Sequence, residues 1–268
     1  MKRRAALAAL VLVAISGCTA LRGRFAGPDI LFVATPEAVS VEMLRVAEVT
    51  GQDVVFDLGS GDGRVVIAAA RDFGARGVGV EIDPTLVKTS KDAALAAGVG
   101  DRATFLWQDL FVTDVREATV VTLYLRDDVN LKLRPKLLDE LAPGTRVVSH
   151  DFDMGDWKAD RIQRVQGPTR LHTLYLWLIP ARVAGTWQTR VGDRDATLTL
   201  TQRYQTIAGT LALDGNQVPI ADGKLEGNRL TLTAGTLTLT GVVIEDTIEG
   251  RADDRSLSSS DWTARRAR

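Results

Sequence analysis

The sequence predicts two successive folds, an α/β domain with a mainly parallel sheet and then a small antiparallel all-β domain. Between residues 30 and 180, short apolar runs suited to buried strands alternate with segments of helical spacing. Past Pro180 the pattern changes to apolar residues that alternate with threonine or charged residues. With 268 residues, 45% of them hydrophobic, the chain is long enough for one large domain or two ordinary ones.

The first part begins with one helix and continues as alternating strands and helices. Residues 35 to 50 have apolar side chains at helical spacing, and Pro36 suits the first turn of a helix. This alternation implies parallel strands joined by right-handed crossovers. We expect strands near 53 to 58, 77 to 82, 103 to 107 and 119 to 125, and helices near 63 to 73, 84 to 97 and 128 to 141.

Three further segments complete the first sheet. Residues 145 to 151 supply a fifth strand, and residues 161 to 165 with 171 to 179 supply an antiparallel hairpin. Open sheets of this kind bind ligands at the carboxyl ends of their parallel strands. Polar residues at those ends are therefore the candidates for function.

The second part, from Gly185 onward, reads as six to eight short antiparallel strands. Residues 197 to 201 and 236 to 240 alternate leucine with threonine, and turn residues at 214 to 216 and 226 to 228 separate such runs. This many strands can form a small barrel or a sandwich. The sequence of this part has no metal-ligand cluster, nucleophile pair or phosphate loop, so we interpret it as a packing or docking module. A ligand-binding small barrel is the alternative.

The most informative segment runs from residue 54 to residue 63, VVFDLGSGDG. A buried strand ends at Asp57, and alternate glycines follow at Gly59, Gly61 and Gly63. Glycines let a turn bring its backbone amides against a ligand at the start of the next helix. The dinucleotide-binding motif needs its third glycine three residues after the second, where this chain has Arg64. A nucleotide-type site is expected here, and a pyrophosphate fits it poorly.

Two more acidic residues stand at the ends of the next two strands. Glu81 closes the second strand, 24 residues after Asp57, and a carboxylate at that offset can accept both hydroxyls of a ribose. Asp109 follows the third strand and can accept a hydrogen bond from an adenine amino group. Three acids at three strand ends indicate a cationic or neutral nucleoside ligand.

These motifs resemble the class I S-adenosylmethionine-dependent methyltransferases. The segments "DLGSGDGR", "GVEID" and "VVSHDF", and Thr35-Pro36 before a helix, are similar to the ATP synthase c-subunit lysine methyltransferase family and its bacterial relatives. The resemblance covers about residues 30 to 180 and implies a Rossmann-like seven-stranded sheet with S-adenosyl-L-methionine as cofactor. It implies these cofactor-binding residues: Asp57, Gly59, Ser60, Gly61, Gly63, Glu81, Ile82, Asp109 and Leu110.

The methyl acceptor is expected near the end of the fourth strand. Tyr124 and Asn130 are our candidates for catalytic residues that line an acceptor channel; packing for Tyr124 and helix capping for Asn130 are the alternatives. The sequence here, Tyr-Leu-Arg-Asp, lacks the proline-containing turn expected in eukaryotic members. His150 with Asp151 could form an acid–base pair, although we expect a structural role, and His172 is expected to be a partly exposed strand residue.

Composition excludes several classes of partner and site. The chain has 33 basic and 34 acidic residues, and without the three basic residues at positions 2 to 4 the remainder carries 30 against 34, a net charge of −4. No basic face is evident, so we expect no nucleic-acid partner. Cys18 is the only cysteine, which excludes a zinc site built from several thiolates, and we predict no metal site.

The N-terminus resembles a bacterial lipoprotein leader. Basic residues 2 to 4 precede the apolar run 5 to 15, and Ile-Ser-Gly-Cys ending at Cys18 is similar to a lipobox. We divide the chain into a signal peptide (1–17), a linker (18–28), a methyltransferase domain (29–180) and an antiparallel β domain (181–268). A lipidated Cys18 would anchor the protein to the bacterial cell envelope, on the periplasmic or outer face. An uncleaved anchor on the cytoplasmic face, or a mis-assigned start, is the alternative.

The sequence predicts a methyltransferase that N-methylates an amine, such as a protein lysine. Two alternatives stay open, a small-molecule or lipid methyltransferase and a non-catalytic nucleoside-binding envelope lipoprotein. The methyl acceptor, the number of methyl groups added and the oligomeric state do not follow from the sequence.

Overall fold

The computed structural model describes residues 33–254 and 259–267, which belong to one compact unit, Phe32–Arg268. The signal peptide, the lipobox cysteine Cys18 and the linker that the sequence predicts lie outside the described residues. Within the described ranges, no helix has the length and apolar character needed to cross a membrane.

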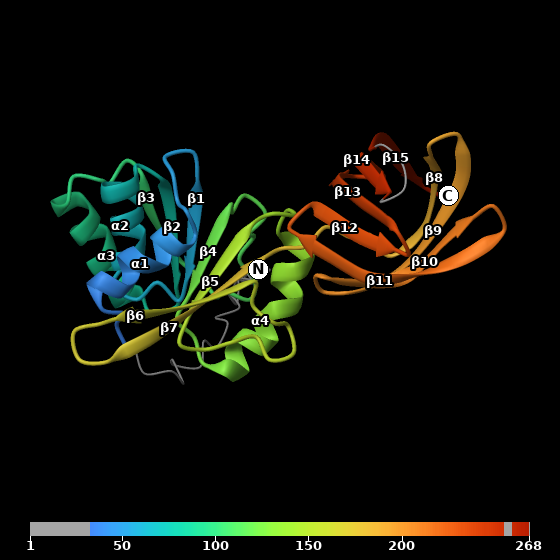
Figure 1. The fold of residues 1–268 in the computed structure, drawn as a ribbon. Helices are drawn as coiled ribbons and strands as arrows, with labels where there is room; N and C mark the ends of the chain where they lie inside the picture. Colours follow the sequence, from blue (N-terminus) through green and yellow to red (C-terminus); the bar gives the residue numbers. More distant parts are fainter. Residues whose placement is uncertain (1–32, 255–258, 268) are drawn as a thin grey trace, which may run out of the picture. The chain divides into compact units, whose positions relative to one another are not determined.

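The first half of this unit contains a seven-stranded sheet in the order β3-β2-β1-β4-β5-β7-β6 (Figure 1). The first five strands are parallel, and β7 pairs antiparallel with both β5 and β6. The Rossmann-like sheet expected from the resemblance is confirmed. Its strands are β1 (Val54–Leu58), β2 (Arg76–Glu81), β3 (Ala103–Trp107), β4 (Val120–Leu123), β5 (Arg146–His150), β6 (Arg161–Gln166) and β7 (Leu171–Leu178).

Four helices connect and cover these strands, and their ends follow local sequence signals. The helix α3 begins with Pro84 after Asp83, whose carboxylate caps the Thr85 amide. The first helix is shorter than its apolar spacing predicts, because Glu48 adopts a left-handed φ of 54° just after its end. The helices are α1 (Glu37–Val46), α2 (Arg64–Phe73), α3 (Pro84–Ala96) and α4 (Asp127–Glu140).

Apolar clusters on the two faces of the sheet hold the helices in place. One cluster joins α1 and α2 to β1, β4, β5 and β7, and a second joins α2 to α3 and β3. A third, with Leu133 and Leu137 of α4, packs on the opposite face. Because the central strands are buried on both faces, their sequences are mostly apolar rather than alternating, with Asp57 and Thr122 as the polar exceptions in β1 and β4.

The second half forms a closed barrel of eight antiparallel strands in the order β10-β11-β12-β13-β14-β15-β8-β9. Eight strands lie at the upper end of the predicted range. Of the two architectures that the sequence left open, a barrel and a sandwich, the structure has the barrel. The strands are β8 (Gly185–Val191), β9 (Arg194–Arg203), β10 (Thr206–Leu213), β11 (Asn216–Glu226), β12 (Arg229–Ala234), β13 (Leu237–Ile244), β14 (Thr247–Asp254) and β15 (Ser260–Arg266).

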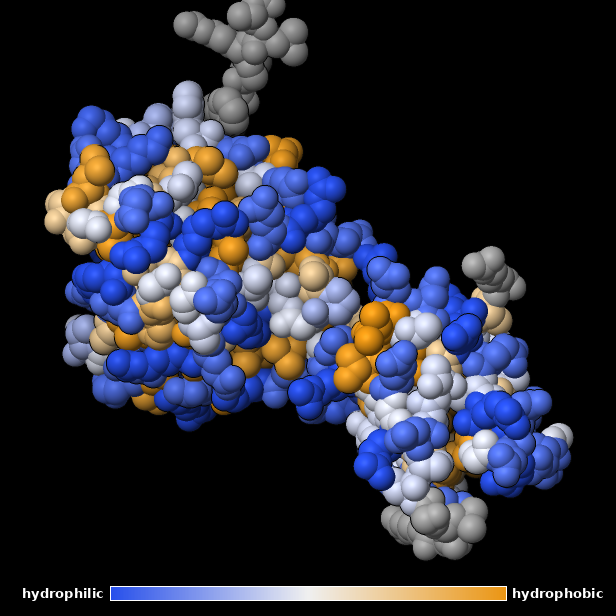
Figure 2. All heavy atoms as spheres, turned by 90° about the horizontal axis from the view of Figure 1, so that it is seen from above, coloured by the Kyte–Doolittle hydropathy of each residue, from blue (hydrophilic) through white to orange (hydrophobic). Residues whose placement is uncertain are grey.

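The barrel is filled by its own side chains. Every second residue of most strands points inward, and the buried cluster includes Trp187, Leu198, Leu232 and Trp262. On the face drawn in Figure 2, hydrophobic residues occur in scattered spots among hydrophilic ones. The interior is filled, and the packing or docking role expected from the sequence stays a prediction.

One tight turn of the barrel contacts the loop that follows β5. Tyr204, with a φ of 54°, stacks on Trp157 at 5.8 Å between ring centroids, and its hydroxyl lies 3.2 Å from both Asp156 carboxylate oxygens. Arg203 also pairs with Asp156 at 3.0 Å. These contacts support the segment that leads from β5 to β6.

Candidate active site

The glycine turn after β1 has the backbone geometry that its sequence predicts. Gly59, Gly61 and Gly63 have φ values of 82°, 54° and 79°, a region that residues with a Cβ adopt with strain. A Cβ on Gly63 would lie 2.6 Å from the ring of Phe105, so glycine is required there for packing as well. The turn is fixed because the Gly59 and Ser60 amides donate to the Val80 carbonyl at 2.8 and 3.0 Å.

Asp57 lies at the centre of the parallel strands, immediately before this turn. Register places it opposite Gly79 of β2 and Thr122 of β4, and the Thr122 hydroxyl donates to its carboxylate at 2.7 Å. The side chain is only 5% exposed. Burial raises the pKa of Asp57 to about 7; the Thr122 hydrogen bond opposes this shift, and the nearby Glu81 and Asp62 charges add to it. A cationic ligand group would remove this penalty.

Glu81 ends β2 and holds the glycine turn from the other side. Its Oε2 accepts the Gly61 amide at 2.9 Å, and its Oε1 accepts the amides of Ile82 and Asp83 at 2.8 and 3.0 Å. These three amides fix the carboxylate while leaving it half-buried. Of the four acceptor sites of the carboxylate, one on Oε2 remains available to a ligand hydroxyl.

Asp109 follows β3, in the position expected for the adenine-side acid. Its Oδ1 accepts the Phe111 amide at 2.8 Å, which sets the loop that contains Leu110, and the side chain is half-buried. Beside it Phe111 and Val112 are 40% and 69% exposed. Apolar side chains next to a hydrogen-bonding carboxylate are the environment that a purine ring requires.

The donors and acceptors of this edge fit S-adenosylmethionine. The buried Ser60 hydroxyl has no hydrogen-bond partner among the described residues, and a Cβ on Gly79 would approach it to 2.7 Å. The same edge of the sheet carries a buried carboxylate at Asp57 for a positive charge, Glu81 for ribose hydroxyls and Asp109 for adenine. These residues would hold the cofactor, whereas the amides of Gly59, Ser60 and Gly61 already donate to Val80 and Glu81.

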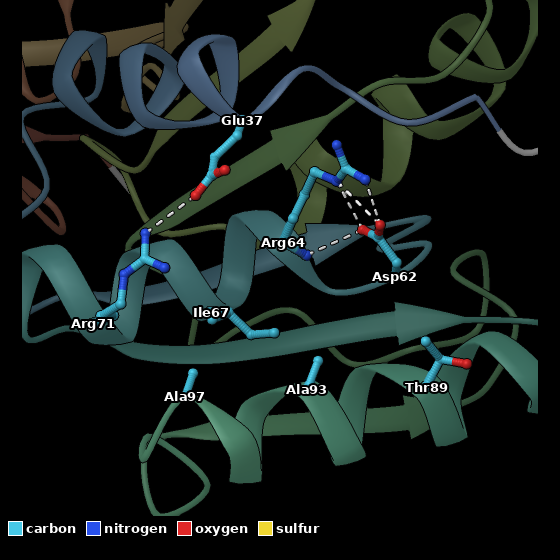
Figure 3. A pocket seen from close by; sticks show the side chains of 8 residues that line it. All are labelled: Glu37, Asp62, Arg64, Ile67, Arg71, Thr89, Ala93 and Ala97. Carbon is cyan, nitrogen blue, oxygen red and sulfur yellow. Dashed lines mark hydrogen bonds and ion pairs between the residues drawn. The ribbon is translucent and has the colours of Figure 1, made fainter.

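A hollow of about 420 Å³ lies beside the glycine turn but on the outer side of α2 and α3 (Figure 3). Asp62 and Arg64 line one end, where Arg64 Nε donates to Asp62 at 2.9 Å, and Ala97 lines the other. Its lining includes neither Glu81 nor Asp109. The hollow is therefore separate from the candidate cofactor site.

The two candidate catalytic residues differ in their surroundings. Tyr124, just past β4, is half-buried and stacks on His150 with 3.9 Å between ring centroids. Asn130 is fully buried on α4, and its Nδ2 lies 3.2 Å from the Ser149 hydroxyl and from the Asp153 carbonyl oxygen. This position does not cap the helix, which begins at Asp127. Asn130 holds the loop after β5, whereas Tyr124 directly follows the carboxyl end of β4.

A pair of histidines is the feature that sequence reasoning missed. His150 and His172 are 0% and 4% exposed, and His150 Nε2 lies 2.7 Å from His172 Nδ1. The expectation that His172 is partly exposed is wrong. Its strand alternates, and His172 shares a face of β7 with Leu174 and Leu176, which pack in the apolar cluster that includes α1. Asp151, at a φ of 62°, directs its carboxylate to within 3.2 Å of His172 Nδ1.

Comparison with known proteins identifies the family. The family model for the ANTKMT methyltransferase domain matches residues 57–161, which span Asp57, Glu81, Asp109 and Tyr124. A protein-lysine N-methyltransferase from Saccharolobus islandicus is 43% identical over 153 residues, which are 57% of this chain and 95% of that protein. The chain belongs to this methyltransferase family. It is a methyltransferase that uses S-adenosylmethionine.

Other relatives of this methyltransferase differ in length and in the acceptor that they are named for. The ATP synthase c-subunit lysine N-methyltransferases of Xenopus laevis and Homo sapiens are 36% and 37% identical; the matches cover 41% and 46% of this chain and about half of each relative, 48% and 50%. An RNA methyltransferase from Salinibacter ruber, solved with S-adenosyl-L-homocysteine, is 56% identical with a TM-score of 0.54. That match covers 56% of this chain and 96% of the other.

Proposed function

We propose that this methyltransferase transfers a methyl group to the ε-amine of a protein lysine. The observation that carries the proposal is the 43% identity to a protein-lysine N-methyltransferase across 95% of that protein. The family match, residues 57–161, includes Tyr124, Asn130 and His150 at the acceptor end. The proposal therefore rests on the part of the chain that would contact an acceptor.

Methyl transfer is an in-line displacement, so the residues mainly orient the acceptor and exclude water. S-Adenosylmethionine supplies the electrophilic methyl group. A lysine acceptor has an ordinary pKa of about 10.4 and must lose its proton before it attacks. Tyr124 offers a phenolic oxygen that can accept a hydrogen bond from the amine. Asp151 raises the pKa of Arg170, as Tyr124 does to a smaller extent, so a permanent cation lies near this phenol and disfavours the ammonium form.

The charges around the acceptor end suit a basic peptide better than a nucleic acid. Burial raises the pKa of Tyr175, and the charges of Asp153, Asp151 and Asp127 raise it further. Tyr175 pairs in register with Ser149 of β5, so these three carboxylates lie around the end of that strand. They outnumber the two cations there by one, since Arg170 pairs with Asp151 and the charge of Arg164 lowers the pKa of Tyr175. Acidic side chains attract a lysine-rich segment and repel phosphate.

A methyl-label partition assay tests the acceptor class. Full-length protein is incubated with methyl-labelled S-adenosylmethionine and a lysate of its own host, and the label is measured in protein, RNA and an organic extract. We expect protease-sensitive label that acid hydrolysis releases as methylated lysine. Label that ribonuclease removes would assign the acceptor to RNA, the acceptor for which the Salinibacter ruber relative is named. Label in the organic extract would indicate a small molecule or lipid.

Tyr124→Phe is the informative variant in this assay. It keeps the ring that stacks on His150 and removes the phenolic oxygen, so we expect methylation to fall roughly 10- to 100-fold, within the range for loss of one hydrogen-bonding group. Tyr204→Phe, which removes a hydroxyl from the turn between β9 and β10, serves as the matched control. Equal loss in both variants would remove Tyr124 from the mechanism.

We also propose that the protein is attached to the bacterial cell envelope through lipid chains on Cys18. The support is the lipobox-like sequence that ends at this cysteine. We expect radiolabelled palmitate to enter the wild type and not Cys18→Ala. Equal labelling of both would exclude the lipid anchor and favour a protein held at the cytoplasmic face, where S-adenosylmethionine is made.

A further inference from the structure

A chain of hydrogen bonds between buried polar side chains crosses the end of the sheet where the methyl acceptor is proposed to bind. Thr35 Oγ1 lies 3.2 Å from His150 Nδ1, and His150 Nε2 lies 2.7 Å from His172 Nδ1. The Asp151 carboxylate is 3.2 Å from His150 Nε2 and 3.2 Å from His172 Nδ1. Thr35, His150 and His172 are 6%, 0% and 4% exposed. Buried polar groups stabilise a protein little compared with well-packed apolar ones, so this chain needs a functional explanation.

The contacts select one protonation pattern for the two rings. Burial lowers the pKa of His150 to about 4, so its ring is neutral at neutral pH. A 2.7 Å contact between ring nitrogens requires one proton between them. If His150 supplied this proton from its Nε2, His172 Nδ1 would present a lone pair to the Asp151 carboxylate. The proton of the His172 ring would then lie on Nε2, a buried atom with no partner among the described residues. We therefore assign the proton to His172 Nδ1, which leaves His150 Nδ1 to donate to Thr35.

The same chain continues to the glycine turn. The Thr35 carbonyl accepts Arg64 Nη1 at 2.8 Å, and Arg64 forms a forked pair with Asp62 inside the turn, with Nε contacts of 2.9 and 3.2 Å. Figure 3 shows the Arg64 guanidinium directed at the Asp62 carboxylate. Thr35, in the segment before α1, is thus held at two points. Its carbonyl bonds to Arg64 on the cofactor side, and its hydroxyl bonds to His150 on the acceptor side.

At its other end, the chain fixes the ring on which Tyr124 lies. His150 and Tyr124 stack at 3.9 Å with 27° between the ring planes, and His150 is held at both nitrogens. Such a ring cannot rotate without breaking two buried hydrogen bonds. The orientation of Tyr124 therefore depends on Thr35 and His172, in addition to the direct hydrogen bond between Tyr124 and Arg170.

We propose that His150 is a positioning residue for methyl transfer, locked by Thr35 and His172 so that Tyr124 faces the acceptor, and that Thr35 couples this arrangement to the glycine turn through Arg64. The proposal rests on the proposed acceptor side at Tyr124. It assigns His150 no contact with substrate. A metal is not the better interpretation of these three side chains, since the Arg170 guanidinium occupies the shared Asp151 Oδ2 at 2.5 Å.

Thr35→Val tests the proposal with the smallest change, because valine keeps the shape and removes the hydroxyl. In the full-length protein we expect kcat for methylation of whichever fraction carries the label to fall roughly 10- to 100-fold, as expected for a displaced catalytic group. The KM for S-adenosylmethionine should change less than about threefold, and Thr35→Ser should restore most of the rate. Thr189→Val in the barrel, also 6% exposed, is the matched control and should leave the rate unchanged.

Nitrogen-15 shifts of the imidazoles give a readout that does not depend on the acceptor. We expect the His150 ring to stay in the neutral Nδ1–H form from about pH 5.5 to 8.5 in the wild type, and to lose that single form in Thr35→Val. A methylation rate in Thr35→Val equal to that of the wild type would overturn the proposal, as would a His150 ring that carries its proton on Nε2. So would uptake of one zinc ion by chelator-treated protein with loss of that uptake in His150→Phe. Label in RNA or in the organic extract would instead refute the lysine assignment and leave this test valid.

Discussion

Glu81→Gln is expected to weaken the binding of S-adenosylmethionine by about 1 to 3 kcal/mol, the range for leaving buried hydrogen-bonding groups unpaired. The carboxylate accepts three backbone amides, those of Gly61, Ile82 and Asp83. An amide side chain can turn only one oxygen to them, so its NH2 group opposes another N–H donor. The substitution therefore loosens the glycine turn and removes an acceptor for the ribose hydroxyls.

Calorimetric titration of the full-length protein measures this effect. Glu117→Gln is the matched control, because Glu117 is exposed and makes only a surface ion pair with Arg76. The unfolding temperature of each variant separates lost binding from lost folding. Equal affinities for wild type, Glu81→Gln and Glu117→Gln would show that Glu81 does not contact the cofactor.

The second large effect is that Asp57 makes the stability of the ligand-free protein depend on pH. Burial raises the pKa of this carboxyl to about 7, whereas an unfolded aspartate titrates near 3.9. Between these values the native state binds the proton and the unfolded state does not. The stabilisation is thus complete below about pH 4 and is lost as the pH rises through 7, on the order of 2 to 4 kcal/mol in total.

Asp57→Asn should remove this dependence. The variant keeps the shape and the Thr122 contact and cannot ionise. We expect the unfolding temperature of ligand-free wild type to fall relative to that of Asp57→Asn between about pH 4 and 7, and the two curves to converge at low pH. If the wild type gains stability relative to the variant over that range, Asp57 is ionised in the ligand-free fold.

Binding of S-adenosylmethionine should reverse the preference of Asp57 for its protonated form, because the positive charge of the ligand favours the ionised carboxylate. We therefore expect its affinity for the wild type to rise from about pH 5.5 to pH 8, with release of a proton from Asp57 on binding. Calorimetry in buffers of different ionisation enthalpy detects that proton. Asp57→Asn should bind more weakly at pH 8 and show no such release.

The strand–helix order and the three strand-end acids could be predicted from sequence because they depend on local patterns. Asp57, Glu81 and Asp109 each follow an apolar run, and parallel strands bring such ends to one edge. The expected boundaries agree with the structure to within one to three residues for most elements. The exception is α1, where the left-handed Glu48 ends the helix before its apolar spacing ends.

The histidine pair and the closure of the barrel could not be predicted in this way. His172 meets His150 only because β7 pairs antiparallel with β5, and Thr35 reaches them from 115 residues away in the chain. Closure of the barrel depends on β15 pairing with β8, between the last and first strands of that part. Alternation in each strand is the same for a sandwich and a barrel, so the sequence left both open.

A crystal structure of the full-length protein with S-adenosyl-L-homocysteine tests the central claim most directly. We expect the ribose hydroxyls on Glu81, the adenine amino group near Asp109, the amino-acid moiety by Asp57 and the Gly59–Gly63 turn, and the sulfur directed toward Tyr124. A ligand bound in the hollow between Asp62 and Ala97, or with its sulfur away from Tyr124, would contradict the assignment of both the cofactor site and the acceptor side.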